Sequence, residues 1–228
     1  LIGWSYLFCA VTYLFTRARL KYILMVWGAL VLVNMLLTPL RDGFSTSESG
    51  LLFGLPKTNI LGDFTDALHL GNGHTQLLTM SGVLLSVVSM KLDRKRVHTK
   101  ALAAVGAVIL LLLATWFTRR WWIIDKIGGT LPWVLISSAI SVGMYGLLSW
   151  LVSIGKSGLL NFVKPAGTAT LTCYMMPHLL YSLMTIFGFS TPAWMNGGIL
   201  GIINCICFSL LCLLLTWILG KIGLKLKI

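Results

Sequence analysis

The chain has 228 residues, of which 57% are hydrophobic and only 11% are charged. A soluble domain carries about 25% charged residues, so this composition excludes that class and predicts a membrane protein. The formal net charge is +12, but the basic residues lie in short loops between apolar segments. That pattern indicates orientation in a membrane and predicts no nucleic-acid partner.

Apolar segments long enough to cross a bilayer core of about 30 Å recur along the chain. Val105 to Thr115 is apolar almost throughout, whereas the strands of a membrane barrel alternate apolar and polar residues. We therefore predict an all-α, polytopic transmembrane helix bundle, with residues 1–228 forming a single transmembrane domain of about seven spans. The predicted spans are 2–15, 22–40, 75–90, 101–117, 131–154, 167–187 and 194–219.

The loop charges predict an orientation. If the loops alternate across the membrane, most of the 18 Lys and Arg residues fall on one side, and of the six acidic residues only Asp93 falls there. The positive-inside rule then predicts an external N-terminus and a cytoplasmic C-terminus, in the cell (inner) membrane. Because the chain begins at Leu1, already in apolar sequence, we expect a longer protein. If its missing N-terminal part begins in the cytoplasm, that part must contribute an odd number of spans.

The longest loop, residues 41–74, is predicted to be external. Its apolar residues recur at helical spacing, which predicts a short amphipathic helix that lies on the membrane or caps a cavity. These residues are Ile60, Leu61, Phe64, Ala67 and Leu68. A lid that only covers helix ends is an equally good interpretation. The segment 71–74 predicts no more than a turn that leads into a capped helix.

The predicted spans contain no Asp, Glu, Lys or Arg, which argues against a pump that relies on an intramembrane carboxylate relay. His178 is the titratable group that lies well inside a span. Pro177 is expected to kink that helix, and Tyr174 lies one turn away from His178 on the same face. The pair is predicted to line a polar cavity, the alternative being a neutral histidine bonded to a neighbouring helix.

Two polar segments open predicted spans. Asp125 and Lys126, on the external side, would hold a polar substrate or anchor the membrane interface. On the cytoplasmic side the polar residues would receive a phosphate; they are Asn161, Lys164, Thr168 and Thr170. The five cysteines all fall in predicted spans without a metal-binding spacing, so we predict neither a metal site nor a disulfide framework.

Three sequence blocks, Gly73–Gly82, Ile124–Trp133 and Pro165–Tyr174, follow one another along the chain. Together they resemble the C-terminal part of bacterial relatives of heparan-alpha-glucosaminide N-acetyltransferase, over about residues 70–220. The resemblance implies a multi-pass membrane acyltransferase. Such an enzyme moves an acetyl group from cytoplasmic acetyl-CoA to a sugar amine or hydroxyl on the external side.

The resemblance also implies roles for the polar residues. The catalytic histidine of that family lies in a region that this chain does not contain, so the catalytic residues stay unassigned. Acetyl-CoA is expected as a co-substrate and no cofactor as permanently bound, while a homodimer is left open. The implied sites are the acceptor side (Asp125, Lys126), the CoA side (Asn161, Lys164, Thr168, Thr170) and the cavity between them (Tyr174, His178).

Two rival functions stay open at this point. A transporter or flippase for a sugar or a lipid-linked sugar would use a similar helix bundle, and inverted repeats with broken spans in both halves would favour it. A membrane scaffold without chemistry of its own is the other rival. A transferase requires an acyl donor, whereas a transporter moves its substrate unmodified.

Overall fold

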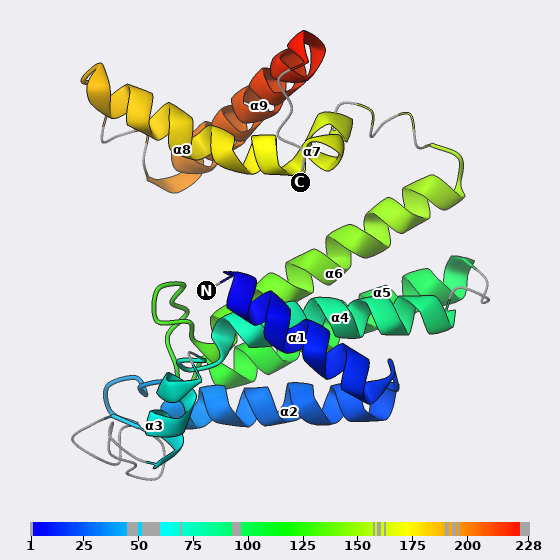
Figure 1. Cartoon of the computed structure of the whole chain (residues 1–228), viewed down its shortest axis with the longest axis vertical. Helices are drawn as coiled ribbons and strands as arrows, with labels where there is room; N and C mark the ends of the chain where they lie inside the picture. Colours follow the sequence, from blue (N-terminus) through cyan, green and yellow to red (C-terminus); the bar gives the residue numbers. More distant parts are fainter. Residues whose placement is uncertain are drawn as a thin grey trace. The chain divides into compact units, whose positions relative to one another are not determined.

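The structure, a computed structural model, describes residues 2–44, 50–51, 60–68, 70–92, 97–156, 158, 161, 163–189, 192, 195 and 197–223. In this part of the chain the regular structure is entirely helical, as predicted. The helices are α1 (Ile2–Thr16), α2 (Leu20–Leu37), α3 (Ile60–Ala67), α4 (His74–Leu92), α5 (Val97–Thr118), α6 (Leu131–Ser153), α7 (Lys164–Thr168), α8 (Thr170–Ile186) and α9 (Gly198–Ile222) (Figure 1). The chain divides into two compact units, unit 1 (Leu1–Ser153) and unit 2 (Ile154–Ile228).

A helix forms in each of the seven predicted spans. Five of these helices, α2, α4, α5, α6 and α9, are long and apolar enough to cross a membrane. At a rise of 1.5 Å per residue, the 15 residues of α1 and the 17 of α8 reach about 22 and 26 Å. Both lengths are below the bilayer core of about 30 Å. The chain is therefore a multi-pass membrane protein with five candidate spans in its described part, and seven spans stay a prediction.

Unit 1 is organised around α4, which contacts α1, α2, α5 and α6. Its core consists of apolar side chains from α1, α2, α4 and α6, including the fully buried Ile23, Leu77 and Met80. Helices α5 and α6 approach closely, because a Cβ added at Gly146 would lie 2.8 Å from the Cβ of Ala104. Small residues at such a contact let two membrane helices pack backbone to backbone.

The outward faces of unit 1 are also apolar. On α5, Leu102, Leu110 and Leu113 are 73%, 68% and 62% exposed. A run of large exposed apolar side chains is rare on soluble proteins. In a membrane the same side chains contact lipid, so α5 has the surface of a lipid-facing helix.

Helices α2 and α5 end at the same end of unit 1. The indole of Trp122 donates to the backbone carbonyl of Thr38 at 3.1 Å, so the segment after α2 lies beside the segment after α5. Helices α1 and α4 end at the opposite end of unit 1 (Figure 1). Arg17, Arg19 and Lys91 lie there, but Arg41, Arg119 and Arg120 lie at the Trp122 end. Which end faces the cytoplasm therefore stays a prediction.

The predicted amphipathic helix is present as α3. Its Ile60 and Phe64 side chains are 89% and 60% exposed, whereas Thr65 and Gly62 are buried within unit 1. The apolar side of α3 therefore faces outward. This arrangement fits a helix that lies at a membrane surface better than one that caps a cavity.

Unit 2 differs from the prediction in one respect. The predicted span 167–187 begins inside the short helix α7, and the chain breaks at Ala169, where φ is −134° and ψ is 51°, before α8 starts. Gly167 and the β-branched Thr168 and Thr170 favour helix weakly, which allows the break. Helix α8 then continues through Pro177.

Candidate functional site

Polar groups gather at one end of unit 1, where the end of α2, the start of α4 and the loop before α6 meet. We call these residues, Asn34, Thr38, Asn72, His74 and Gly129, the asparagine cluster. Asn34 is fully buried, and its Nδ2 donates to the backbone carbonyls of Asn72 at 3.1 Å and Gly129 at 3.0 Å. Asn34 therefore ties three chain segments together.

The side chain of Asn72 continues the network. Its Nδ2 donates to the carbonyl of Gly128 at 2.8 Å and lies 3.4 Å from Thr38 Oγ1. Its Oδ1 lies 2.6 Å from Nδ1 of His74 and 3.4 Å from the His74 backbone nitrogen. Asn72 thus serves both as a cap for α4 and as the group that orients the His74 ring.

Gly129 is required at its position in the cluster. Its φ of +59° lies in the left-handed region, which side chains other than glycine rarely adopt. A Cβ at Gly129 would also overlap the His74 ring. The loop before α6 can therefore lie against His74 only because residue 129 is a glycine.

Asp125 shapes the same loop. Its Oδ1 accepts from the backbone N–H of Ile127, and its Oδ2 accepts from that of Gly128, each at 2.9 Å. Both carboxylate oxygens therefore hold the turn that presents Gly129, while Lys126 is exposed. A direct part for Asp125 and Lys126 in binding an acceptor stays a prediction.

Two of the three quoted sequence blocks meet in this cluster, since His74 belongs to Gly73–Gly82 and Gly129 to Ile124–Trp133. Residues 71–74 are predicted from the sequence only as a turn, and no local pattern points to Asn34, Asn72 or His74 as site residues. One signal could have found them: Asn34 is an amide in the middle of an otherwise apolar predicted span. A buried amide needs hydrogen-bond partners, which here are the two loops.

Unit 2 contains a second polar site, a pocket of about 260 Å³ between α7 and the end of α9. We call it the lysine pocket. Three of the four residues predicted for the CoA side line it: Asn161, Lys164 and Thr168. Helix α9 contributes Thr216, Trp217, Gly220 and Lys221, and Pro165 and Ala169 complete the lining. Thr170 is absent from the lining, and its hydroxyl donates to the carbonyl of Gly167 at 3.2 Å.

The lysine pocket is positively charged. Lys221 Nζ lies 4.0 Å from the centre of the Trp217 ring, a cation–π distance that holds the ammonium beside the pocket. Lys164 lies on the opposing helix α7 and is exposed. The sequence from residue 154 to residue 228 contains five lysines and no Asp or Glu. No Asp or Glu side chain of unit 2 therefore offsets the field of these two lysines.

The predicted cavity pair, Tyr174 and His178, lies on α8. The two rings are 5.9 Å apart in an edge-on arrangement, and both side chains are exposed. They line neither of the pockets described in unit 2. Their role in a cavity stays a prediction.

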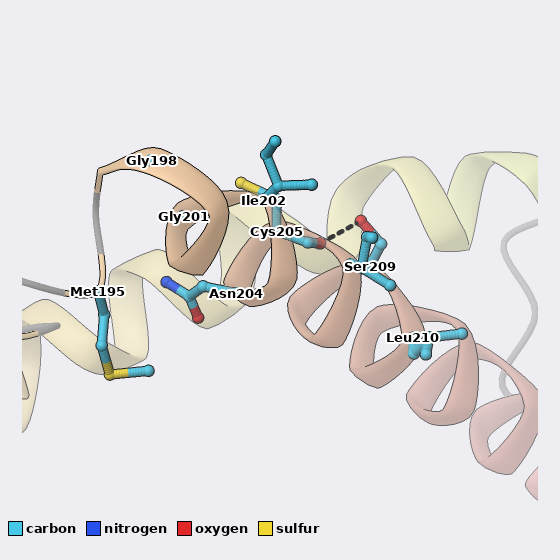
Figure 2. Close-up of a pocket in the computed structure, with 9 residues that line it drawn as sticks. Met195, Gly198, Gly201, Ile202, Asn204, Cys205, Ser209 and Leu210 are labelled. Carbon is cyan, nitrogen blue, oxygen red and sulfur yellow. Dashed lines mark hydrogen bonds between the residues drawn. The ribbon is translucent and has the colours of Figure 1, made fainter.

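A wider, shallower groove of about 600 Å³ runs along one face of α9 (Figure 2). No side chain fills the groove at Gly198 and Gly201, because glycine has none. The Asn204 amide lines the groove together with Met195. The Ser209 hydroxyl is bonded to the Cys205 carbonyl of its own helix at 2.7 Å. Such a face suits contact with another helix, and it brings no set of reactive groups together.

No group of three or more metal-binding side chains forms among the residues that the structure describes. The cysteines described there, Cys9, Cys173, Cys205, Cys207 and Cys212, are free thiols. Comparisons with protein-family models, with curated proteins and with solved structures found no match for this chain. The residues of the two polar sites and the resemblance of the three sequence blocks are therefore the features that bear on function.

Proposed function

We propose that the chain is the C-terminal part of a membrane acyltransferase that takes an acetyl group from cytoplasmic acetyl-CoA and transfers it to a sugar amine or hydroxyl on the external side. The observation that carries the proposal is the lysine pocket. Lys164 and Lys221, which are 57 positions apart in the sequence, line one pocket together with Trp217 and Asn161.

The chemistry of the pocket suits a phosphate-bearing ligand. Coenzyme A carries phosphate groups and an adenine ring. Two ammonium groups bind phosphate oxygens by charge-assisted hydrogen bonds, and the face of Trp217, which is 45% exposed, offers a surface on which a base can stack. Pockets for drug-sized ligands span about 300–1,000 Å³. At about 260 Å³, the lysine pocket suits the phosphate end of the molecule rather than the whole.

The position along the chain is also consistent with this ligand. The pocket includes the end of α9, whose last turn carries Lys221, and the positive-inside rule favours the cytoplasm for that end. Acyl-CoA is a cytoplasmic compound. The same rule accounts for lysines at this position without any ligand, so the proposal needs a functional test.

The test is acetyl transfer by the full-length protein in membranes, with acetyl-CoA labelled in the acetyl group and glucosamine as the acceptor. We expect labelled N-acetylated product. We also expect Lys164→Ala and Lys221→Ala each to raise the KM for acetyl-CoA about tenfold or more, since each removes a hydrogen bond to a charged group worth about 1.5–3 kcal/mol. Lys156→Ala is the matched control and should leave that KM unchanged, because Lys156 is an exposed lysine of unit 2 that does not line the pocket.

The alternative function is a transporter or flippase for a sugar or a lipid-linked sugar. It predicts that labelled sugar crosses the membrane unmodified and that acetyl-CoA has no effect. That result, with no labelled product, would reject the acyltransferase. If labelled product forms and neither lysine substitution raises the KM for acetyl-CoA, the protein is an acyltransferase but the lysine pocket is not its CoA site.

A further inference from the structure

We propose that His74 is a binding residue of the acceptor side, and that its Nε2 accepts a hydrogen bond from a hydroxyl or amine of the sugar. This inference rests on the proposed function for the identity of the ligand. The choice of His74 as the binding residue rests on the hydrogen bonds of the asparagine cluster.

The network fixes the protonation of the His74 ring. The amide nitrogen of Asn72 is surrounded by acceptors, the carbonyl of Gly128 at 2.8 Å and that of Gly129 at 3.4 Å. The other amide atom of Asn72 must then be its oxygen, which can only accept. This oxygen lies 2.6 Å from His74 Nδ1, so Nδ1 carries the proton and donates it.

A neutral histidine with its proton on Nδ1 has a lone pair on Nε2. No hydrogen bond to Nε2 forms within the part of the chain that the structure describes. The ring is half-buried and held by Asn72 on one side and Gly129 on the other. His74 therefore presents a positioned acceptor at the end of unit 1 that carries the predicted external loops.

A second observation points to a ligand at the same place. The Oδ1 atom of the fully buried Asn34, which belongs to the asparagine cluster, has no partner in the described structure. A buried polar atom without a partner costs about 1–3 kcal/mol. The asparagine cluster therefore contains two acceptors without a donor, Asn34 Oδ1 and His74 Nε2, and a hydroxyl or amine of a sugar is a group that donates to such an acceptor.

The first experiment measures the protonation of the two ring nitrogens of His74. The chain has four histidines, so ¹⁵N-histidine labelling of the full-length protein in detergent gives few signals, and loss of one signal in His74→Asn assigns it. We expect Nε2 of His74 to resonate as an unprotonated nitrogen and to shift on addition of glucosamine, with ammonium chloride at the same concentration as the control. A proton on Nε2, or no shift specific to glucosamine, would overturn the proposal.

The second experiment separates binding from structure. In His74→Asn the shorter amide can still donate to Asn72 Oδ1, while the acceptor at the Nε2 position is lost. We expect unchanged thermal stability and a KM for glucosamine raised about tenfold, with the KM for acetyl-CoA unaffected. An unchanged KM for glucosamine would mean that His74 only supports the fold.

The two proposals fail in different ways. If the wild-type protein does not use acetyl-CoA, the proposed function fails, while the nitrogen signal of His74 still reports whether a sugar binds there. If transfer occurs but neither the signal nor the glucosamine KM responds to His74, the inference about His74 fails alone.

Discussion

The two polar sites of this protein are built in opposite ways. In the asparagine cluster, the side-chain amides of Asn34 and Asn72 donate hydrogen bonds to backbone carbonyls of neighbouring segments. The cluster lies where two helices and a loop meet. In the lysine pocket, Lys164 and Lys221 are exposed, and Lys221 rests on the ring of Trp217. The amide nitrogens of the first site are bonded to the backbone of the protein, whereas the charges of the second site are open to a ligand.

The difference teaches what each site contributes. A buried amide network stabilises a fold because each lost partner exposes an unsatisfied group in a medium without water. Exposed cations contribute little to stability and much to the attraction of anions. Substitution of Asn34 or Gly129 should therefore change mainly the stability of the protein, and substitution of Lys164 or Lys221 mainly its affinity for a ligand.

The largest expected loss of stability is that of Gly129→Ala. The left-handed backbone costs a residue with a side chain about 1–2 kcal/mol, and the overlap with the His74 ring adds about 1–3 kcal/mol. We expect the free energy of unfolding in detergent to fall by about 2–5 kcal/mol. Gly71→Ala is the control, because its φ is +54° but its Cβ would meet no atom within 4 Å. Equal losses in the two variants would contradict the close contact with His74.

The next effect compares two asparagines in apolar helices. Asn34→Leu leaves the carbonyls of Asn72 and Gly129 without their buried donor, which should cost about 1–3 kcal/mol. Asn204→Leu, in the open groove of α9, should change stability by no more than about 0.5 kcal/mol. Thermal unfolding of the two variants in the same detergent measures the difference. A more harmful Asn204→Leu would reverse the comparison.

A smaller effect separates close from open packing within unit 1. Gly146→Ala forces a Cβ to 2.8 Å from that of Ala104, so α5 and α6 must separate at a cost of about 1–2 kcal/mol. Gly106→Ala, on α5, meets nothing within 4 Å and should stabilise the helix by about 0.5–1 kcal/mol. Thermal unfolding measures both changes in stability. A loss for Gly146→Ala with a gain for Gly106→Ala supports the packing of α5 on α6, and changes of the same sign in both variants reject it.

The smallest expected change in stability is that of the lysine pocket itself. Because both side chains are exposed, the double variant Lys164→Ala/Lys221→Ala should unfold within about 0.5 kcal/mol of the wild type. A loss of several kcal/mol would show that the pocket is a structural element like the asparagine cluster. Thermal unfolding without ligand is the measurement.

Much of the fold follows from the sequence. Apolar length predicts the helices of unit 1, and the spacing of Ile60, Phe64 and Ala67 predicts α3, because both depend on local periodicity. The break at Ala169 is not predicted. A run of Gly and Thr lowers helix propensity, but it does not determine the residue at which the helix ends. Which end of unit 1 faces the cytoplasm stays a prediction.

The sites were predictable to different extents. Asn161, Lys164 and Thr168 are close in sequence, so their common location could be expected, but Lys221 and Trp217 come from the other end of unit 2. The asparagine cluster joins residues 34, 72 and 129. Such contacts depend on which helix ends meet in space, which no local pattern reports.

The most direct test of the account is the affinity of the full-length protein in detergent for coenzyme A and for pantetheine, which lacks the phosphates and the adenine. We predict that coenzyme A binds at least about tenfold more tightly than pantetheine, and that Lys164→Ala/Lys221→Ala removes most of this difference while Lys156→Ala preserves it. Equal affinities for the two compounds, or a preference that survives the loss of both lysines, would contradict the assignment of the lysine pocket to an acyl-CoA donor.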